Sequence, residues 1–201
     1  MIPILVIAIA YLMGGIPFGY LLVKLTTGAD VRRAGSGNIG ATNVLRTTGR
    51  AAGVATLLLD IGKGYLAVWL AGRVTEQSPW WMAAAALAVM AGHAYPVFLR
   101  FQGGKAVACF VGAFLCLTPV ALAATLVVFV VTVAWTRYIS MGSIVAAATF
   151  PLAVWLIQRP AFPVILAAFV AGGFIIYRHS SNIHRLREGR EHAFRFGAPK
   201  K

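Results

Sequence analysis

Stretches of about 20 apolar residues, nearly free of charge, recur along this chain, and a helix needs roughly that length to cross a bilayer. Hydrophobic residues make up 60% of the 201 residues and charged residues 11%. Soluble domains, by contrast, are about a quarter charged. A water-soluble domain of this length could not bury so much apolar surface. The sequence therefore predicts an all-α integral membrane protein.

The expected architecture is a single membrane domain, residues 1–201, with seven transmembrane helices and a basic cytoplasmic tail over 179–201. The fourth span is the shortest, and Thr118-Pro119 separates it from the fifth with almost no loop. A six-span alternative joins these two segments into one bent helix. The N-terminus lacks a basic segment before its apolar run, so we interpret it as a first span and not as a signal peptide. The predicted spans are 2–25, 52–72, 80–99, 105–118, 119–136, 139–158 and 161–178.

The net charge of +13 arises from 18 Lys and Arg against five Asp and Glu. If the N-terminus is outside, only Arg73 and Arg159 fall in outer segments and Lys63 falls within a span. Every other Lys and Arg then falls inside, including Arg195, Lys200 and Lys201 in the tail. Cytoplasmic loops of membrane proteins are enriched in Lys and Arg, so this asymmetry predicts an outer N-terminus and a cytoplasmic C-terminus. The same rule explains the basic balance without a nucleic-acid partner.

Cys109 and Cys116 lie seven residues apart in one apolar segment. On a helix that spacing is a rise of about 10 Å, which is too long for a disulfide within the chain. We expect both cysteines to be packing residues. The sequence shows no group of residues with the spacing of metal ligands, so we expect no metal and no cofactor.

The first polar segment, residues 35–46, reads GSGNIGATNVLR. Glycine lets a backbone turn tightly and approach a ligand, and successive backbone N–H groups in such turns can hold an anion. Ser36, Thr42 and two asparagines add neutral hydrogen-bonding groups, and Arg46 adds a charged fork suited to phosphate. An ordinary glycine-rich loop is the alternative, but this polar density at a predicted membrane surface favours a ligand site.

The second polar segment, residues 92–105, reads GHAYPVFLRFQGGK and connects the third predicted span to the fourth. Gly103, Gly104 and Lys105 are predicted to open the fourth helix, whose N-terminal N–H groups and positive dipole end would favour an anion. The alternative is a glycine turn beside a lysine that reaches toward water. His93 lies near a membrane boundary, and its role is left open between structure and catalysis.

The third polar segment, residues 177–191, reads YRHSSNIHRLREGRE and directly follows the last predicted span. A basic tail that binds anionic lipid is one interpretation. His179 and Asn182 are three residues apart, so a helix would place them on one face. Glu188 and Glu191 are expected to pair with nearby arginines.

Two charged residues, Asp60 and Lys63, lie three apart within the second predicted span. Charges inside a membrane normally pair with each other and face protein or water. We interpret them as a structural ion pair, and a proton or ion path is the alternative.

In this order and between these spans, the three polar segments closely resemble the bacterial acyl-phosphate:glycerol-3-phosphate acyltransferase family, PlsY. The resemblance extends to about Phe196. It implies a seven-helix enzyme of the bacterial inner membrane, with its active site facing the cytoplasm. The implied reaction transfers a fatty acyl group from acyl phosphate to the 1-hydroxyl of sn-glycerol 3-phosphate, giving lysophosphatidic acid and inorganic phosphate. The implied partners are these substrates and membrane lipid, and we expect a monomer.

The chain also departs from a different class of acyltransferase. No histidine is followed by aspartate at the spacing used by many acyl-CoA-dependent glycerolipid acyltransferases. The expected catalytic residues are Ser36, Arg46, His93, Lys105, His179 and Asn182. The residues expected to bind the phosphate and glycerol groups are Gly35, Ser36, Gly37, Asn38, Thr42, Asn43, Arg46, Gly103, Gly104, Lys105, His179 and Asn182.

An acyl phosphate has a good leaving group, so we expect direct attack by the hydroxyl in a ternary complex, helped by positioning and charge stabilisation. The proton acceptor is open between His93, His179 and a substrate phosphate oxygen. An acyl-enzyme on Ser36 is the competing mechanism and would need an adjacent base. A transporter for a phosphorylated anion and a non-catalytic lipid-binding scaffold are the rival functions. The one-sided polar residues argue against a transporter, which binds its substrate near mid-membrane.

Overall fold

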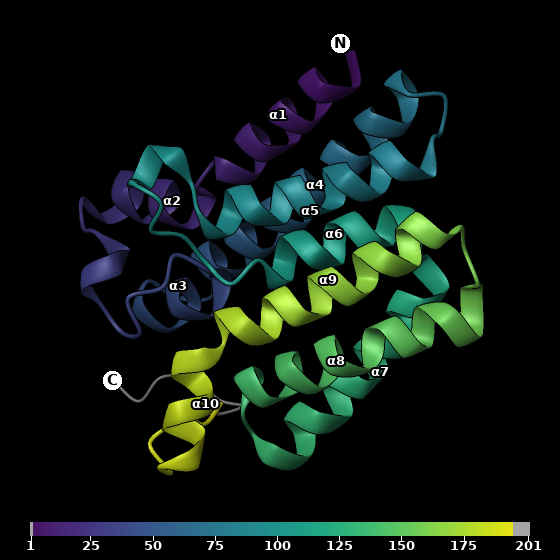
Figure 1. Ribbon diagram of the computed structural model, residues 1–201. Coiled ribbons are helices and arrows are strands. Elements are labelled where there is room, and N and C mark those ends of the chain that lie inside the picture. The colour runs from purple at the N-terminus through teal and green to yellow at the C-terminus, as the bar shows by residue number, and fades with distance from the viewer. Residues whose placement is uncertain (1, 195–201) are drawn as a thin grey trace.

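The computed structural model describes residues 2–194, and every regular element in that range is a helix (Figure 1). The longer helices lie side by side, roughly parallel or antiparallel to one another (Figure 1). They are α1 (Ile2–Gly15), α2 (Phe18–Thr27), α4 (Arg50–Val74), α5 (Pro79–Ala94), α6 (Val107–Leu117), α7 (Pro119–Thr136), α8 (Ile139–Ala153) and α9 (Phe162–Arg178). The shorter elements are η1 (Val31–Arg33), α3 (Ala41–Thr47), η2 (Val97–Leu99), the π-helical turn η3 (Val154–Gln158) and α10 (Ser180–Arg187).

The lengths of these helices fit an integral membrane protein. Among the described residues, five helical segments are long and apolar enough to cross a membrane, and α9 with α10 makes a sixth when the pair is taken together across its 54° bend. Helix α6 has 11 residues, which is short for a span. The five segments are Ile4–Thr27, Arg50–Val74, Pro79–Leu99, Pro119–Thr136 and Ile139–Gln158. The all-helical membrane fold is confirmed, and the count of seven spans stays a prediction.

The first span is a broken helix. Helix α1 ends at Gly15 and α2 begins at Phe18, because Pro17 has no backbone N–H to continue the ladder. The break frees backbone carbonyl groups inside the membrane, where an unpaired polar group is costly. The ammonium group of Lys63 donates a hydrogen bond to the carbonyl oxygen of Ile16 at 2.7 Å. A charged residue of α4 therefore satisfies the break in its neighbour.

The start of α6 differs from the prediction. We expected Gly103, Gly104 and Lys105 to open this helix, but its first residue is Val107. The preceding residue, Ala106, has a left-handed backbone with φ of 61°, which prevents the helix from extending toward the glycines. The prediction was wrong, and the two glycines and the lysine form a non-helical segment instead.

Glycines bring neighbouring helices into close contact at two crossings. A Cβ on Gly92 of α5 would overlap the carbonyl oxygen of Tyr11 on α1. Similarly, a Cβ on Gly112 of α6 would overlap the carbonyl oxygen of Ile61 on α4. Close backbone approach through small residues is a main source of helix association in membranes. These contacts fix α5 and α6, which carry the second polar segment between them.

Aromatic side chains pack the interior around α6. The rings of Phe110 and Phe114 lie 4.7 Å from the ring of Phe150 on α8, in edge-to-face contacts. Cys109 and Cys116 are both free thiols, and Cys109 is buried beside this cluster. The prediction that they form no disulfide is confirmed.

The polar segments gather at one end of the bundle. Figure 1 shows α2, α3 and α10 at the left-hand end, while the N-terminus lies at the opposite end. The prediction that the polar segments share one face is therefore confirmed. Arg195, Lys200 and Lys201, which the charge analysis assigned to the same side, lie outside the described residues.

Candidate active site

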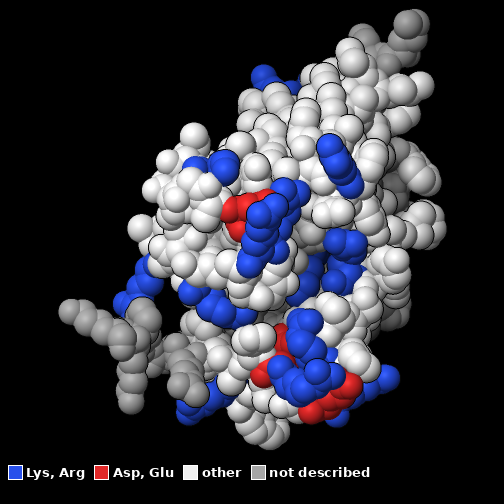
Figure 2. All heavy atoms as spheres, turned by 90° about the vertical axis from the view of Figure 1, so that its left-hand side faces the viewer, with Lys and Arg blue, Asp and Glu red and all other residues white. Residues whose placement is uncertain are grey.

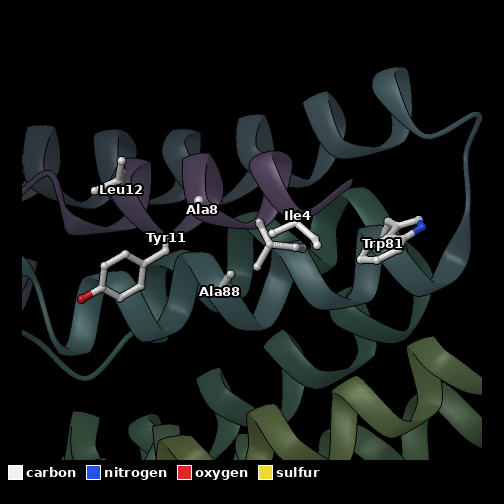
Figure 3. A pocket seen from close by; sticks show the side chains of 7 residues that line it. Ile4, Ala8, Tyr11, Leu12, Trp81 and Ala88 are labelled. Carbon is white, nitrogen blue, oxygen red and sulfur yellow. The ribbon is translucent and has the colours of Figure 1, made fainter. Parts of the chain in front are cut away.

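Two regions of the surface are candidate sites. A groove of about 600 Å³ runs between α1 and α5 and is lined by apolar side chains that include Ile4, Leu12 and Trp81 (Figure 3). The hydroxyl group of Tyr11 in this groove donates a hydrogen bond to the carbonyl oxygen of Tyr95 at 2.6 Å. None of the side chains that line this groove is charged, so it offers an anion no positive side chain. Figure 2 shows instead that Lys and Arg side chains gather at the end of the bundle that carries α2, α3 and α10.

The glycine-rich loop before α3 is held together by one buried amide. Asn43 is 2% exposed, and its side-chain nitrogen donates hydrogen bonds to the carbonyl oxygens of Asn38 at 2.8 Å and Ala34 at 3.1 Å. A weaker hydrogen bond from the same nitrogen reaches the carbonyl oxygen of Val31 at 3.3 Å. Its side-chain oxygen accepts a hydrogen bond from the backbone N–H of Ser36 at 2.9 Å. Asn43 thus has a structural role in shaping the loop, and its expected contact with substrate stays a prediction.

The loop uses its own backbone N–H groups. Besides Ser36, the N–H of Gly37 donates to the carbonyl oxygen of Ala34 at 3.1 Å, and the N–H of Gly40 donates to the side chain of Asn38 at 2.7 Å. These three N–H groups are not free for an anion, so the predicted backbone nest was wrong for them. What the loop presents outward is the exposed Ser36, which lies between Gly35 and Gly37, both with positive φ, of 58° and 71°.

Helix α3 continues this loop and carries two more of the expected site residues. Thr42 lies in its first turn and is partly buried, and Arg46 lies in its last turn and is exposed. The charge of Arg46 is one of the causes that lower the pKa of Lys105. Val44 of the same helix packs in one buried cluster with Leu99 of the second polar segment, so the two segments meet at this end of the bundle.

The segment before α6 is clamped by an arginine. Arg178, at the end of α9, donates hydrogen bonds to the carbonyl oxygens of Gly104 at 3.0 Å and Gly103 at 3.4 Å. Its guanidinium group also lies over the ring of Tyr95, 4.8 Å from the ring centre. A Cβ on Gly104 would overlap the imidazole ring of His93. Glycine is therefore required here so that the segment can lie against this histidine.

Lys105 joins the second and third polar segments. Its ammonium group donates a hydrogen bond to the side-chain oxygen of Asn182 in α10. The amide nitrogen of Asn182 donates in turn to Glu191 at 2.6 Å, and the same carboxylate oxygen accepts from the hydroxyl group of Ser140 at 2.9 Å. Arg185 pairs with the other oxygen of Glu191 at 2.7 Å. The predicted pairing of Glu191 with a nearby arginine is confirmed, and Glu188 likewise pairs with Arg190.

The charges around Lys105 favour a bound anion. Burial lowers the pKa of Lys105 to about 8; Glu191 opposes this shift, whereas Arg185, Arg178 and Arg46 strengthen it. Burial would raise the pKa of Glu191, but hydrogen bonds from Asn182, Arg185 and Ser140 lower it, so the carboxylate stays charged. Glu191 is the one carboxylate among four cationic side chains named here, so most of their positive charge is not neutralised. We call this group the cationic recess, formed by Arg46, Lys105, Arg178 and Arg185 around Glu191.

His179 lies beside this recess but is buried, at 3% exposure. Its Nδ1 atom is 2.8 Å from the carbonyl oxygen of Ile175, a contact in which a neutral ring with a proton on Nδ1 donates. Burial, followed by the nearby charge of Lys105, lowers the pKa of His179 to about 4. His179 is therefore neutral at pH 7.

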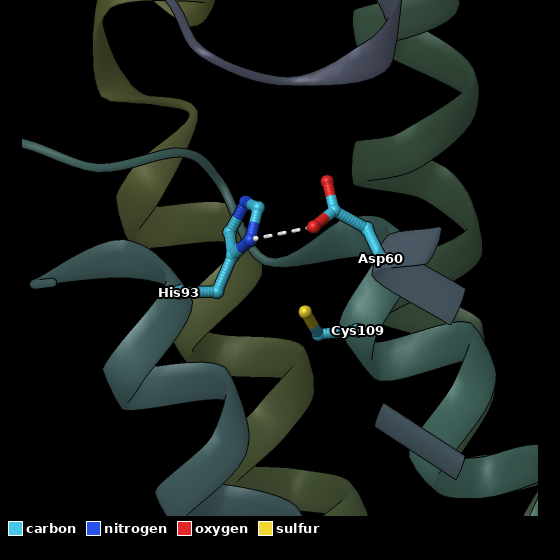
Figure 4. Close-up of side chains that lie close together, drawn as sticks. All are labelled: Asp60, His93 and Cys109. Atoms are coloured by element: carbon cyan, nitrogen blue, oxygen red, sulfur yellow. Dashed lines mark ion pairs between the residues drawn. The ribbon is translucent and has the colours of Figure 1, made fainter. Parts of the chain in front are cut away.

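His93 lies behind the recess. It is 4% exposed, and its ring stands between Asp60 on α4 and Gly104, with Nδ1 3.6 Å from a carboxylate oxygen of Asp60 (Figure 4). Asp60 also pairs with Lys63 at 2.8 Å, so the predicted ion pair within the span is confirmed. The structure thus joins Lys105 to Asn182 by a hydrogen bond, and the charge of Arg46 acts on the same lysine. The ring of His93 is buried against Gly104, the residue before Lys105.

Sequence reasoning did not single out Arg178, Arg185, Glu191 or Ser140 as site residues. The first three lie in the third polar segment, whose high density of charge was the available signal. Ser140 is the second residue of α8, and no local pattern marks it. Its place in the site depends on how the chain folds back to bring Glu191 against it.

Comparisons with known proteins show which family this chain resembles. A family model described as glycerol-3-phosphate acyltransferase matches residues 4–189. A protein named glycerol-3-phosphate acyltransferase from Geobacter sulfurreducens is 47% identical over 188 residues, covering 94% of this chain and 95% of the relative. Another of the same name, from Trichlorobacter lovleyi, is 50% identical over 190 residues, covering 94% and 96%.

Two crystal structures share the fold. Both are of PlsY (YgiH), described as an integral membrane glycerol 3-phosphate acyltransferase. The glycerol 3-phosphate form has a TM-score of 0.91 and 38% sequence identity, and the alignment covers 97% of this chain and 96% of that one. The lysophosphatidic acid form has a TM-score of 0.89 and 37% identity, with the same coverage.

Proposed function

This chain belongs to the glycerol-3-phosphate acyltransferase family, and we propose that it transfers a fatty acyl group from acyl phosphate to the 1-hydroxyl of sn-glycerol 3-phosphate. The products are lysophosphatidic acid and inorganic phosphate. Support for the acceptor comes from the PlsY structures, whose descriptions give glycerol 3-phosphate and lysophosphatidic acid forms of that protein. Support for an acyl phosphate donor comes from the resemblance of the three polar segments.

The observation that carries the proposal is the cationic recess. Both substrates bring a phosphate group, so the site needs positive charge for two anions. Arg46, Arg178 and Arg185 offer planar forks, and Lys105 offers a partly buried amine among them. Ser36 and Thr42 are placed to bind neutral oxygens of the same substrates. A bound phosphate would replace the repulsion among these cations with attraction.

In the proposed reaction, the 1-hydroxyl oxygen of glycerol 3-phosphate attacks the carbonyl carbon of the acyl phosphate. The bond between that carbon and the phosphate oxygen breaks, and phosphate leaves with the electron pair. Lys105 and the arginines stabilise the charge that develops on the carbonyl oxygen and on the leaving phosphate. Because both substrates are held in one recess, the reaction needs no acyl-enzyme.

We propose that a substrate phosphate oxygen accepts the proton of the hydroxyl. A base works best when its pKa lies near the working pH, and the second pKa of a phosphate monoester is about 6. His179 has a pKa of about 4 and is a weaker base. Lys105, with a pKa of about 8, is mostly protonated at pH 7 and serves as a cation. His179 and Asn182 then hold the recess in shape and contact the bound phosphate groups.

The acyl-enzyme alternative depends on Ser36. A serine nucleophile needs a base within hydrogen-bonding distance of its hydroxyl group. Among the described residues, the hydrogen bonds of Ser36 involve its backbone N–H, and no side-chain base is paired with its hydroxyl group. This favours direct attack, with Ser36 as a binding residue.

The topology belongs to the same proposal. We propose a single membrane domain of seven spans in the bacterial inner membrane, with the N-terminus outside and the cationic recess facing the cytoplasm. The support is the distribution of Lys and Arg, which gather at the end of the bundle that carries the recess (Figure 2). In the same proposal the protein works as a monomer, with Arg46, Lys105, Arg178 and Arg185 of one chain forming the recess.

The test is phosphate release by purified protein in lipid, with glycerol 3-phosphate and either palmitoyl phosphate or palmitoyl-CoA. We expect phosphate and lysophosphatidic acid with the acyl phosphate alone. Arg185→Ala should reduce the rate, whereas the matched control Arg187→Ala, at an exposed arginine of the same helix, should not. Product from the thioester would contradict the donor. Uptake of glycerol 3-phosphate into liposomes without any product would favour a transporter.

A further inference from the structure

A buried group of three polar side chains lies behind the segment that carries Lys105, and Figure 4 shows two of them, Asp60 and His93. Asp60, Lys63 and His93 are 1%, 5% and 4% exposed. Ionisable residues inside a membrane are costly to keep, so a role for them is expected by default. The reaction proposed above does not use Asp60 or Lys63, which leaves the purpose of this group to be explained.

One side of the group anchors it to two helices. The carboxylate of Asp60 lies 2.8 Å from the ammonium group of Lys63, which also binds the carbonyl oxygen of Ile16 at the break in the first span. The same carboxylate oxygen faces Nδ1 of His93 at 3.6 Å. This distance is beyond a normal hydrogen bond, so the attraction is electrostatic, and neither of these two buried atoms has a hydrogen-bond partner among the described residues. Asp60 thus faces the side of the imidazole that points toward α4.

The other side of the group touches the reaction site. The Nε2 side of the His93 ring packs against Gly104, where a Cβ would overlap the ring. The carbonyl oxygen of His93 accepts a hydrogen bond from the N–H of Gly104 at 3.0 Å. Lys105 is the next residue, and its amine enters the cationic recess. A shift of the imidazole would therefore shift the backbone immediately before Lys105.

We propose that Asp60 is a positioning residue, which acts through His93 and Gly104 to hold the amine of Lys105 in the cationic recess. The proposal rests on the proposed function for its catalytic consequence. Asp60 contacts no substrate in this scheme. Lys63 balances its charge and ties the group to the break between α1 and α2 through the carbonyl oxygen of Ile16.

A metal site is the alternative use of these residues. Ligand atoms of Asp60, His93 and Cys109 lie within 4.8 Å of one another, close enough to share an ion. However, the ammonium group of Lys63 already lies 2.8 Å from Asp60 and would repel a cation bound at the same carboxylate. An ion pair that orients the histidine therefore fits the charges better than a metal centre.

The decisive variant is Asp60→Asn with Lys63→Met, which removes both charges together. Removing one partner would leave a buried charge unpaired, whereas removing both leaves no such penalty. The double variant also loses the hydrogen bond from Lys63 to the carbonyl oxygen of Ile16, so its thermal unfolding is measured first. If the pair is only structural, a double variant that folds should work as the wild type does. If Asp60 positions Lys105, kcat/KM for both substrates should fall by about 10- to 100-fold, because small misplacements in a site cost that much.

A second readout does not depend on activity. The competitive acetylation rate of Lys105, followed by mass spectrometry across pH, reports the pKa of its amine. Burial holds that pKa at about 8, and a loosened segment would expose the amine and raise the pKa. We expect this rise in the double variant and also in His93→Gln, which keeps both charges and removes the ring. Thr125→Val, at a buried residue bonded within its own helix, is the control and should change neither readout.

The outcomes separate this proposal from the proposed function. If the wild type makes no lysophosphatidic acid, the reaction is refuted, and a raised Lys105 pKa in the double variant would still support the positioning role. A folded double variant with wild-type kcat/KM and an unchanged Lys105 pKa would refute the positioning role. Stoichiometric zinc in the purified protein, lost in Cys109→Ser, would also refute it in favour of a metal centre.

Discussion

Lys105→Met removes a partly buried positive charge from the cationic recess while keeping an unbranched side chain of similar length. Two unit charges about 4 Å apart interact by about 4 kcal/mol when the effective dielectric constant is near 20. Part of this is offset, because burial already disfavours the charged amine and lowers its pKa to about 8. A net loss of about 3 kcal/mol in the transition state corresponds to roughly 100-fold in kcat/KM.

The effect on stability should have the opposite sign. The pKa of Lys105 is lowered in the folded protein, so its charged form is less favourable there than in the unfolded chain. Removing the charge also relieves repulsion from Arg46, Arg178 and Arg185. We therefore expect an equal or higher Tm in Lys105→Met, together with the loss of activity.

The assay is phosphate release at low concentrations of both substrates, beside thermal unfolding in the same detergent. Arg187→Ala serves as the control for removal of an exposed cation. Activity within about threefold of the wild type would refute the argument, because about 0.7 kcal/mol is too little for a cation that contacts phosphate. A large fall in Tm would show instead that Lys105 is mainly structural.

Other predictions follow from the same geometry. kcat/KM should fall as pH rises through about 8, because Lys105 loses its proton there, and a pH profile of the wild type checks this. The same lysine adds stability as pH rises from about 8 toward its unfolded value, since its folded pKa is depressed, and Tm against pH measures this. Gly104→Val should abolish phosphate release while the protein stays in the membrane fraction, and Gly173→Ala, at a site with open space, should be neutral. With both native cysteines replaced, Ser78→Cys should react with an impermeant maleimide in intact cells, whereas Ser181→Cys should react only after permeabilisation.

Much of the fold could be predicted because it follows from the length of apolar runs. The predicted spans 119–136 and 139–158 agree with α7 and with α8 plus η3 to the residue. Pro17 was a visible signal for the break in the first span, since proline interrupts the helical ladder. By contrast, nothing in the local sequence shows that Lys63 would bind the carbonyl oxygen of Ile16, because this contact depends on how α4 packs against the first span.

The site could be predicted as a set of segments but not as a set of contacts. The polar density of residues 35–46 pointed to a functional loop, yet the use of Asn43 as an internal brace depends on distances within the folded loop. The glycines before Lys105 suggested a helix N-terminus, whereas their purpose is close approach to His93. The local sequence does not show which polar residues will be buried by elements far away along the chain.

Glu191 completes the cationic recess from near the end of the described chain, and this has a consequence for synthesis. A ribosome makes the first polar segment early and Glu191 late, after all the longer helices. Until then, Asn182 and Arg185 lack their carboxylate, and Ser140 lacks the acceptor that ties α8 to the recess. Chains that end before Glu191 therefore cannot assemble the recess, which forms only after that residue has been made.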